Sequence, residues 1–155
     1  MGFQILALDA EQFSNLPALD DTELARLGVE RHVVDAKPGY PCRVSLLDCD
    51  IGDTVLLLNY EHQPANSPYR SSHAIFIREG ASTASIEPNQ VPEQLRIRTL
   101  SVRAFDKAGM MLDAEVIAGD ELEPLFTRLF ESTNTEYLHV HNAARGCFAA
   151  TVVRA

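Results

Sequence analysis

Residues 96–117 read RIRTLSVRAFDKAGMMLDAEVI, in which two alternating segments flank the turn-forming residues DKAG at 106–109. Alternation of apolar and polar side chains is typical of a strand with one buried face, and glycine suits a tight turn that needs a positive φ. Alternation places three side chains of the first segment on one face: Leu100, Val102 and Ala104. The stretch therefore predicts an antiparallel hairpin of two strands, 96–105 and 110–117.

An amphipathic helix is expected directly after this hairpin. Apolar residues recur there at the i, i+3, i+4, i+7 and i+8 positions of a helix: Leu122, Leu125, Phe126, Leu129 and Phe130. Pro124 falls in the first turn, where a missing N–H matters least. We expect this helix to pack its apolar stripe on the sheet.

Further strands are expected on both sides of this unit, at 3–8, 29–34, 54–60, 73–78, 137–141 and 147–154. The run 54–60 is almost continuously apolar, which favours a central strand covered on both faces. Asp20 and Glu23 have the spacing of a capping box and predict a second, short helix. The fold class is α+β: a mainly antiparallel sheet of about six to eight strands with two helices packed against it, in a single domain spanning 1–155.

Charge and composition exclude several classes of function. The chain of 155 residues has 22 acidic and 13 basic residues, for a formal net charge of −9. A net negative charge of this size repels phosphate backbones and anionic lipids, so we expect neither nucleic-acid nor membrane partners. No apolar run approaches the length of a membrane span, and residues 1–9 lack the basic start of a signal peptide. A cytoplasmic location is expected.

A histidine pair on the predicted strand 137–141 suggests a first kind of site. His139 and His141 project from the same face of that strand, about 6.6 Å apart along it. Two imidazoles so placed are a workable pair of metal ligands, and a third ligand is available from Cys147, His62 or His73. The alternative is that both histidines form hydrogen bonds within a polar sheet face.

A cysteine near a histidine suggests a second kind of site, because a neighbouring imidazole can help a thiol to ionise and attack. Cys147 lies in the same predicted hairpin as His141, and the sequence would place it on the histidine face if the two residues were opposite one another. The predicted catalytic group is Cys147 with His141 and His62. The competing interpretation is a small buried thiol, which is how most single cysteines are used.

Arginines in turn-rich segments suggest a third kind of site, for a small anionic ligand. Arg43, Arg70 and Arg145 each lie beside proline or glycine, and Arg103 lies in the predicted hairpin. Hydrogen-bonding residues accompany them and complete the predicted ligand-binding set: Asn59, Tyr60 and Asn142. A self-contained surface loop is the alternative.

Several of these segments also resemble one known family. They are the motifs PCR at 41–43, LLNYEHQP at 57–64, SPYR at 67–70 and YLHVHN at 137–142, followed by RGCF at 145–148. They are similar to a bacterial family catalogued as a domain of unknown function (number twelve hundred and three), and the similarity runs nearly end to end. The resemblance implies a stand-alone bacterial protein and brings no known activity, cofactor or catalytic residue.

Three functions therefore remain open at the level of the sequence. They are a protein that binds or acts on a small anionic metabolite, a metal-binding protein with a His-x-His site, and a non-catalytic interaction domain. Whether the chain is an enzyme, and which cofactor it uses, do not follow from the residues. We also expect the segments 41–43, 59–64, 68–70 and 139–147 to meet in one pocket, because each lies at a strand end or in an adjoining turn.

Overall fold

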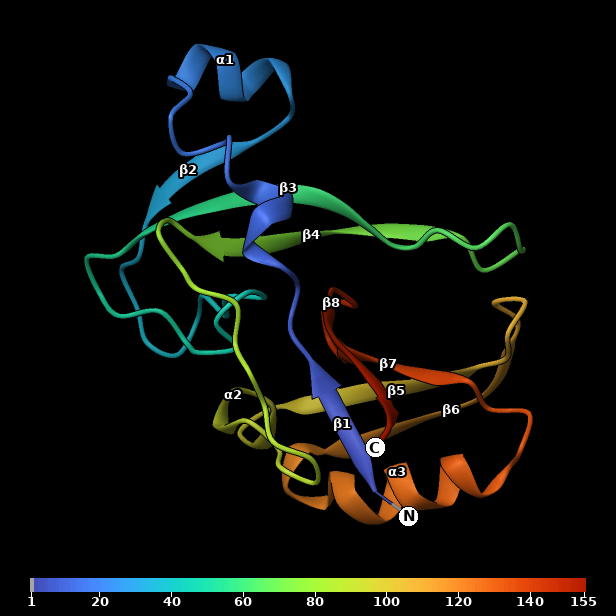
Figure 1. The fold of residues 1–155 in the computed structure, drawn as a ribbon. Helices are drawn as coiled ribbons and strands as arrows, with labels where there is room; N and C mark the ends of the chain where they lie inside the picture. The colour runs from blue at the N-terminus through green and yellow to red at the C-terminus, as the bar shows by residue number, and fades with distance from the viewer. Residues whose placement is uncertain (1) are drawn as a thin grey trace.

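The computed structural model, which describes residues 2–155, has eight strands in two antiparallel sheets (Figure 1). The larger sheet has the order β1-β8-β7-β5-β6, and the smaller one has the order β2-β3-β4. The strands are β1 (Phe3–Leu6), β2 (Glu30–Val33), β3 (Thr54–Gln63), β4 (Ser71–Arg78), β5 (Thr99–Phe105), β6 (Met111–Ala118), β7 (Tyr137–Asn142) and β8 (Phe148–Arg154).

Helix α3 (Leu122–Glu131) covers one face of the larger sheet (Figure 1). Its five apolar positions are all buried, and they pack with the inward residues of β5, β7 and β8 in one core. The ring of Phe126 meets that of Phe3 edge to face, with 5.0 Å between the centroids. The predicted core helix is confirmed, as is the buried face of β5 formed by Leu100, Val102 and Ala104.

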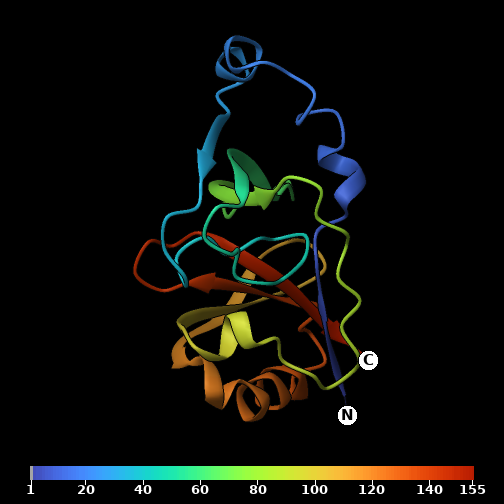
Figure 2. The same cartoon turned by 90° about the vertical axis from the view of Figure 1, so that its left-hand side faces the viewer.

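The smaller sheet lies over the opposite face of the larger one, so that the layers are small sheet, large sheet and helix (Figures 1 and 2). It has its own apolar core, in which Val55, Leu56 and Leu58 of β3 pack with Ile75 and Ile77 of β4. Strand β3 is central within this sheet, as predicted. Leu57 on its other face is only half-buried and Asn59 is exposed, so β3 is not covered on both sides along its length.

The shorter helices are α1 (Asp21–Arg26), α2 (Glu93–Arg96) and the 3₁₀ turns η1 (Ala10–Phe13) and η2 (Gly119–Glu121). The predicted capping box opens α1, where Asp20 accepts from the Glu23 backbone and Glu23 accepts from that of Asp20. Helix α1 lies beside β2, at the end of the molecule away from α3 (Figure 1). None of the helices within residues 2–155 is long and apolar enough to cross a membrane.

The fold class is α+β, as the sequence predicts, but the strands divide between two sheets instead of forming one. The start of the predicted strand 96–105 is also different, because α2 occupies 93–96 and β5 begins only at Thr99. The two hairpins predicted from alternation, β5–β6 and β7–β8, are both present.

The condition under which Cys147 would join the histidine face is not met. His141 lies opposite Phe148, and not opposite Cys147, because the register between β7 and β8 shifts by one residue after Val140. A bulge of this kind changes which side chain faces a given neighbour. Cys147 therefore lies in the turn before β8, and the ring of Phe148 takes the place beside the histidines.

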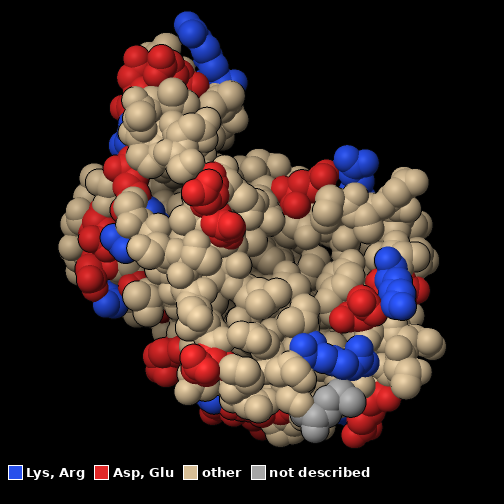
Figure 3. Space-filling model, in the orientation of Figure 1, with Lys and Arg blue, Asp and Glu red and all other residues tan. Residues whose placement is uncertain are grey.

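Charged side chains are distributed unevenly over the surface. On the face shown in Figure 3 the acidic and basic side chains form small separate groups with uncharged areas between them. Helix α1 carries acidic residues in its first turn and Arg26 in its last, which is the favourable arrangement for a helix dipole.

Candidate metal centre

Three histidines from three strands converge between the two sheets. They are His62 on β3, His73 on β4 and His141 on β7, and their ligand nitrogens all lie within 4.8 Å of one another. His62 and His141 are buried and His73 is half-buried. Three imidazoles converging in this way are a typical ligand set for a transition-metal ion.

Strand pairing explains part of this convergence. On β4, His73 shares a face with the core residues Ile75 and Ile77 and is paired with Tyr60 of β3. The β3–β4 register shifts between Tyr60 and Gln63, so His62 lies at an irregularity of the ladder, and its direct contact with His73 shows that its ring turns towards that residue. On β7, His141 projects away from the α3 core that receives Leu138 and Val140.

The hydrogen bonds of the three rings leave nitrogen lone pairs free to bind a metal. Nδ1 of His141 is 2.8 Å from the carbonyl oxygen of Gly146, a distance at which Nδ1–H donates to that carbonyl. The other ring nitrogen, Nε2, is then an acceptor, and it is buried without a partner among the described residues. A backbone carbonyl holding Nδ1 while Nε2 is free is the arrangement usual for a metal-binding histidine.

His62 and His73 approach each other directly. Nε2 of His62 lies 2.7 Å from Nδ1 of His73 and 3.3 Å from the hydroxyl of Ser71. A contact of this length between two imidazole nitrogens is an N–H···N hydrogen bond, in which one ring donates to the other. Binding both rings to one ion would replace this bond and move the two nitrogens to more than about 3 Å apart.

Burial keeps these imidazoles neutral. It lowers the pKa of His62 to about 4, helped by the neighbouring His73 and Arg103, and lowers that of His141 to about 3 against the opposing bond to Gly146. The pKa of His73 is also lowered by burial, with a smaller contribution from Arg103. Because metals bind the unprotonated ring, neutral histidines are ready to act as ligands near pH 7.

His139 lies against the three histidines but outside the group whose nitrogens come within ligand distance of one another. Its ring centroid is 5.6 Å from that of His62 and 6.2 Å from that of His141. Burial lowers its pKa to about 3, and its Nδ1 has no partner among the described residues. The sequence predicts His139 and His141 as the ligand pair, whereas the geometry gathers His141 with the two histidines of the smaller sheet.

The ring of Phe148 packs against the histidine cluster. It stacks on the ring of His62, with 5.2 Å between centroids and 6° between planes, and it meets His139 and His141 edge-on. The register shift that displaces Cys147 thus supplies an apolar ring that fixes three imidazoles. Such support limits the freedom of the ligands before any ion binds.

A cleft of about 960 Å³ opens beside the cluster, and His73 is part of its wall. The rest of the wall comes from the segment before β3, from β3 and β4, and from the turn between β7 and β8: Tyr40, Arg43, Leu57, Phe76, Asn142 and Arg145 among others. A metal ion held by His73 and its two partners would therefore have a side accessible to small molecules.

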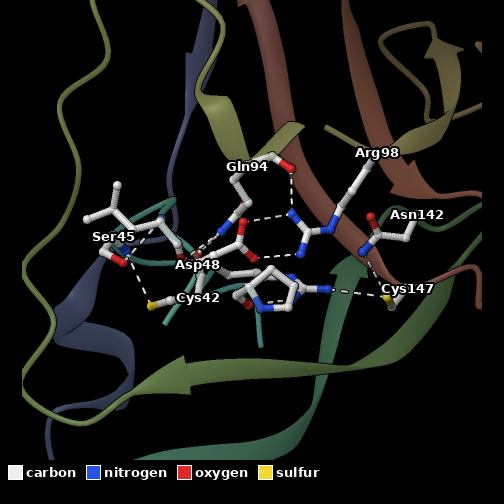
Figure 4. Close-up of polar contacts among 10 residues, drawn as sticks. Cys42, Ser45, Asp48, Gln94, Arg98, Asn142 and Cys147 are labelled. Atoms are coloured by element: carbon white, nitrogen blue, oxygen red, sulfur yellow. Dashed lines mark hydrogen bonds and ion pairs between the residues drawn. The ribbon is translucent and has the colours of Figure 1, made fainter. Parts of the chain in front are cut away.

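Arg43 and Cys147 form a second polar group in this wall. The Arg43 side chain is 1% exposed and donates to the carbonyl oxygens of Phe148 (2.7 Å) and Pro41 (2.6 Å) and to Sγ of Cys147 (3.3 Å). Nδ2 of Asn142 donates to the same sulfur at 3.2 Å (Figure 4). Cys147 therefore lies at the end of a buried arginine and not on the histidine cluster.

An ion pair braces the wall of the cleft behind this group. Arg98 binds both carboxylate oxygens of Asp48, at 2.6 and 3.0 Å, and also the carbonyl oxygen of Gln94 (Figure 4). The amide of Gln94 donates in turn to the carbonyls of Cys42 and Leu47. These bonds tie the loop that carries Arg43 to α2 and β5.

The other predicted site residues lie in different surroundings. Arg145 is exposed at the cleft mouth, whereas Arg70 is exposed elsewhere and pairs with Glu61 at 3.1 Å. Asn59 is exposed on β3. Tyr60 is half-buried between the rings of Phe13 and Phe148. Of the segments expected to meet, 41–43, the end of β3 and 139–147 come together, and 68–70 lies apart.

Arg103 lies beside the centre, although the predicted ligand-binding set does not include it. It is paired with His139 across β5 and β7, and its Nε donates to the hydroxyl of Ser101, which is paired with His141. The sequence names Arg103 among the arginines of an anion site, and alternation on β5 also turns it away from the α3 core, because it lies between Val102 and Ala104.

Comparison with known proteins gives one match. The sequence model of the family described as "Protein of unknown function (DUF1203)" matches residues 39–154, which confirms the resemblance and leaves only the first 38 residues and the last outside it. All three histidines, Arg43, Arg103 and Cys147 lie within the matched segment. No curated protein and no solved structure matches the chain.

Proposed function

The chain belongs to the DUF1203 family, and we propose that it is a metal-binding protein in which His62, His73 and His141 hold a divalent transition-metal ion. The observation that carries this proposal is the approach of three imidazole nitrogens, from three different strands, to within 4.8 Å of one another. Three neutral histidines with one side open are the ligand set of a zinc site that can take a further ligand.

Two features support a metal over a purely structural cluster. Nε2 of His141 is buried without a partner among the described residues, which would cost about 1–3 kcal/mol in the absence of a ligand. His73 lines a cleft large enough for a small molecule, so the open side of the ion would face a space that a substrate can enter. The ion would act there as a Lewis acid or activate a bound water.

The direct test is metal analysis of protein purified without a histidine tag. The protein is stripped with a chelator, loaded with Zn²⁺ or Co²⁺ and desalted, and the metal bound per chain is measured. We expect about one ion per chain, and for Co²⁺ an absorption spectrum of nitrogen ligation without a thiolate charge-transfer band.

Two variants make the test specific. His73→Ala removes a half-buried ligand at the cleft and should reduce stoichiometric binding to near zero. His32→Ala is the matched control, because His32 is an exposed histidine of β2 that pairs only with Glu30. A wild-type protein that retains no ion, or a His73→Ala variant that retains as much as the control, would contradict the proposal.

A further inference from the structure

A positively charged side chain, Arg103, lies beside the histidine cluster. The Nε atom of Arg103 is bonded only to a hydroxyl, and no carboxylate within residues 2–155 forms an ion pair with this side chain. Arg103 is paired with His139 across β5 and β7, and Ser101, to which its Nε donates, is paired with His141. A divalent ion held by neutral imidazoles would add two more positive charges at this place.

The cleft beside the cluster has the same character. Its wall contains Arg43, Arg98 and Arg145 and no acidic residue, in a chain whose net charge is −9. Arg98 is neutralised by Asp48, and Arg43 is fully engaged with two carbonyls and the sulfur of Cys147. Arg145 is exposed at the mouth and is free, among the described residues, to bind an anion that enters.

The remaining wall of the cleft is apolar. Leu57 and Phe76 face it from the smaller sheet, and Tyr40 and Pro41 face it from the preceding loop. A volume of about 960 Å³ is far more than one inorganic anion fills. The cleft is therefore shaped for a molecule with an anionic group and an apolar body.

We propose that the cleft binds a small organic oxyanion, a carboxylate or phosphate ester, whose charged oxygens reach the open side of the metal and are held by Arg145 at the cleft mouth. This inference rests on the proposed metal site. Arg103 supplies the fixed charge beside the histidines, and Arg145 supplies a planar donor at the mouth that can bind two oxygens at once. Oxyanions are favoured because no protein carboxylate neutralises the site.

Benzoate and phenyl phosphate are suitable probes, since each joins one oxyanion to an apolar ring. Each is titrated calorimetrically into zinc-loaded protein, with benzyl alcohol as the neutral analogue. We expect at least one anion to bind, and benzyl alcohol to bind about ten-fold more weakly or not at all, because it lacks the charge-assisted bonds. Tighter binding of benzoate would identify the anionic group of the ligand as a carboxylate, and tighter binding of phenyl phosphate would identify it as a phosphate ester.

Variants of the two arginines test the assignment. Arg145→Ala should lower the affinity by about ten-fold, since it removes a charged hydrogen-bond donor, and Arg103→Gln should lower it less, since it removes only a nearby positive charge. Arg26→Ala changes the net charge by the same amount on α1, far from the cleft, and should leave the affinity unchanged. The inference would be overturned if all three variants bound the anion with the affinity of the wild-type protein. It would also be overturned if neither anion bound to the metal-loaded wild-type protein.

The cobalt spectrum separates this inference from the metal proposal. In cobalt-loaded protein the bound anion should change the visible bands, which reports a new ligand at the ion. If the protein binds no metal, the proposed function fails whatever the anions do. If the protein binds metal, but the anions neither change the cobalt spectrum nor release or absorb heat in the titration, the proposed metal site is retained and the oxyanion inference fails.

Discussion

The two ring nitrogens of His141 have different roles, and this difference links the turn to the cluster. Nδ1 is held by the carbonyl of Gly146, at a residue whose φ of 78° lies in the left-handed region. Only glycine adopts that conformation without strain, so the turn that positions the carbonyl depends on Gly146. Nε2 is left free as a consequence, and the next residue, Cys147, points the other way towards Arg43.

The three cysteines should differ sharply in reactivity. Cys42 is 0% exposed and Cys49 is 3% exposed, and burial, with Cys42 and Asp53 nearby, raises the pKa of Cys49 to about 12. Cys147 is half-buried in the cleft wall beside a guanidinium. We expect a thiol reagent to modify about one cysteine of the native chain, Cys147, and all of them after unfolding.

Peptide mapping after brief alkylation checks this expectation. Cys147→Ser should leave the native protein almost unmodified, whereas Cys49→Ser should not change the rate. Modification of Cys42 or Cys49 in the native state, at a rate similar to that of Cys147, would contradict the burial of those thiols.

At the scale of elements, what could be predicted from the sequence was set by local periodicity. The apolar stripe of α3, the capping box of α1 and both hairpins follow from spacings within about ten residues. The His-x-His pattern of β7 likewise predicts two rings on one face. The division into two sheets and the meeting of His62 and His73 with His141 depend on packing between β3, β4 and β7, about which local spacing carries no information.

The register shift in the β7–β8 hairpin shows the same limit on a smaller scale. The sequence would place Cys147 on the histidine face only if it lay opposite His141, and the shifted register puts Phe148 there instead. Side-chain period in a strand is two, so one unpredicted bulge reverses the assignment of faces beyond it. Local spacing therefore names candidate residue types, while their contacts in space come only from the structure.

The connection from β6 into α3 depends on Gly119. A Cβ atom at this position would lie 1.8 Å from the carbonyl oxygen of Leu95 and 2.7 Å from its carbon, both of them backbone atoms. Gly119→Ala should therefore destabilise the fold by about 4 kcal/mol or more, a size seen only when packing is severely violated. The free energy of unfolding, measured in urea, checks the value.

Gly39→Ala is the control for this substitution. Its added Cβ would be 3.6 Å from the nearest atom, the carbonyl oxygen of Ala36, which is an ordinary contact. We expect a change within about 1 kcal/mol in either direction. If the two alanine variants unfold at the same urea concentration, the close approach of η2 to α2 is not as described.

At the scale of the whole molecule, the histidines lie where the two sheets meet. His62 and His73 belong to the smaller sheet, and His139 and His141 to the larger one. Protonating any of them would place a charge between the layers, next to Arg103 of β5 and to the other rings. The same geometry that gathers metal ligands therefore makes the metal-free protein sensitive to acid.

The sign of this sensitivity follows from the direction of the pKa shifts. In the folded chain the pKa values of His62, His139 and His141 are lowered to about 4, 3 and 3, while the unfolded chain titrates near the ordinary value of 6.5. Between these limits the unfolded state binds more protons, so the free energy of unfolding falls as the pH falls below about 6.5. Above that pH the contribution is fully present.

The prediction is a loss of about 1 kcal/mol per buried histidine for each pH unit between about 6.5 and 5, before the carboxylates begin to titrate. Urea unfolding of chelator-treated protein at several pH values measures it. His139→Phe removes one titrating ring, keeps an aromatic side chain among Phe105, Tyr137 and Phe148, and should make the slope shallower. His32→Ala removes an exposed histidine and should leave the slope unchanged. A free energy of unfolding that stays constant over this range would mean that the rings titrate normally and that water reaches the space between the sheets.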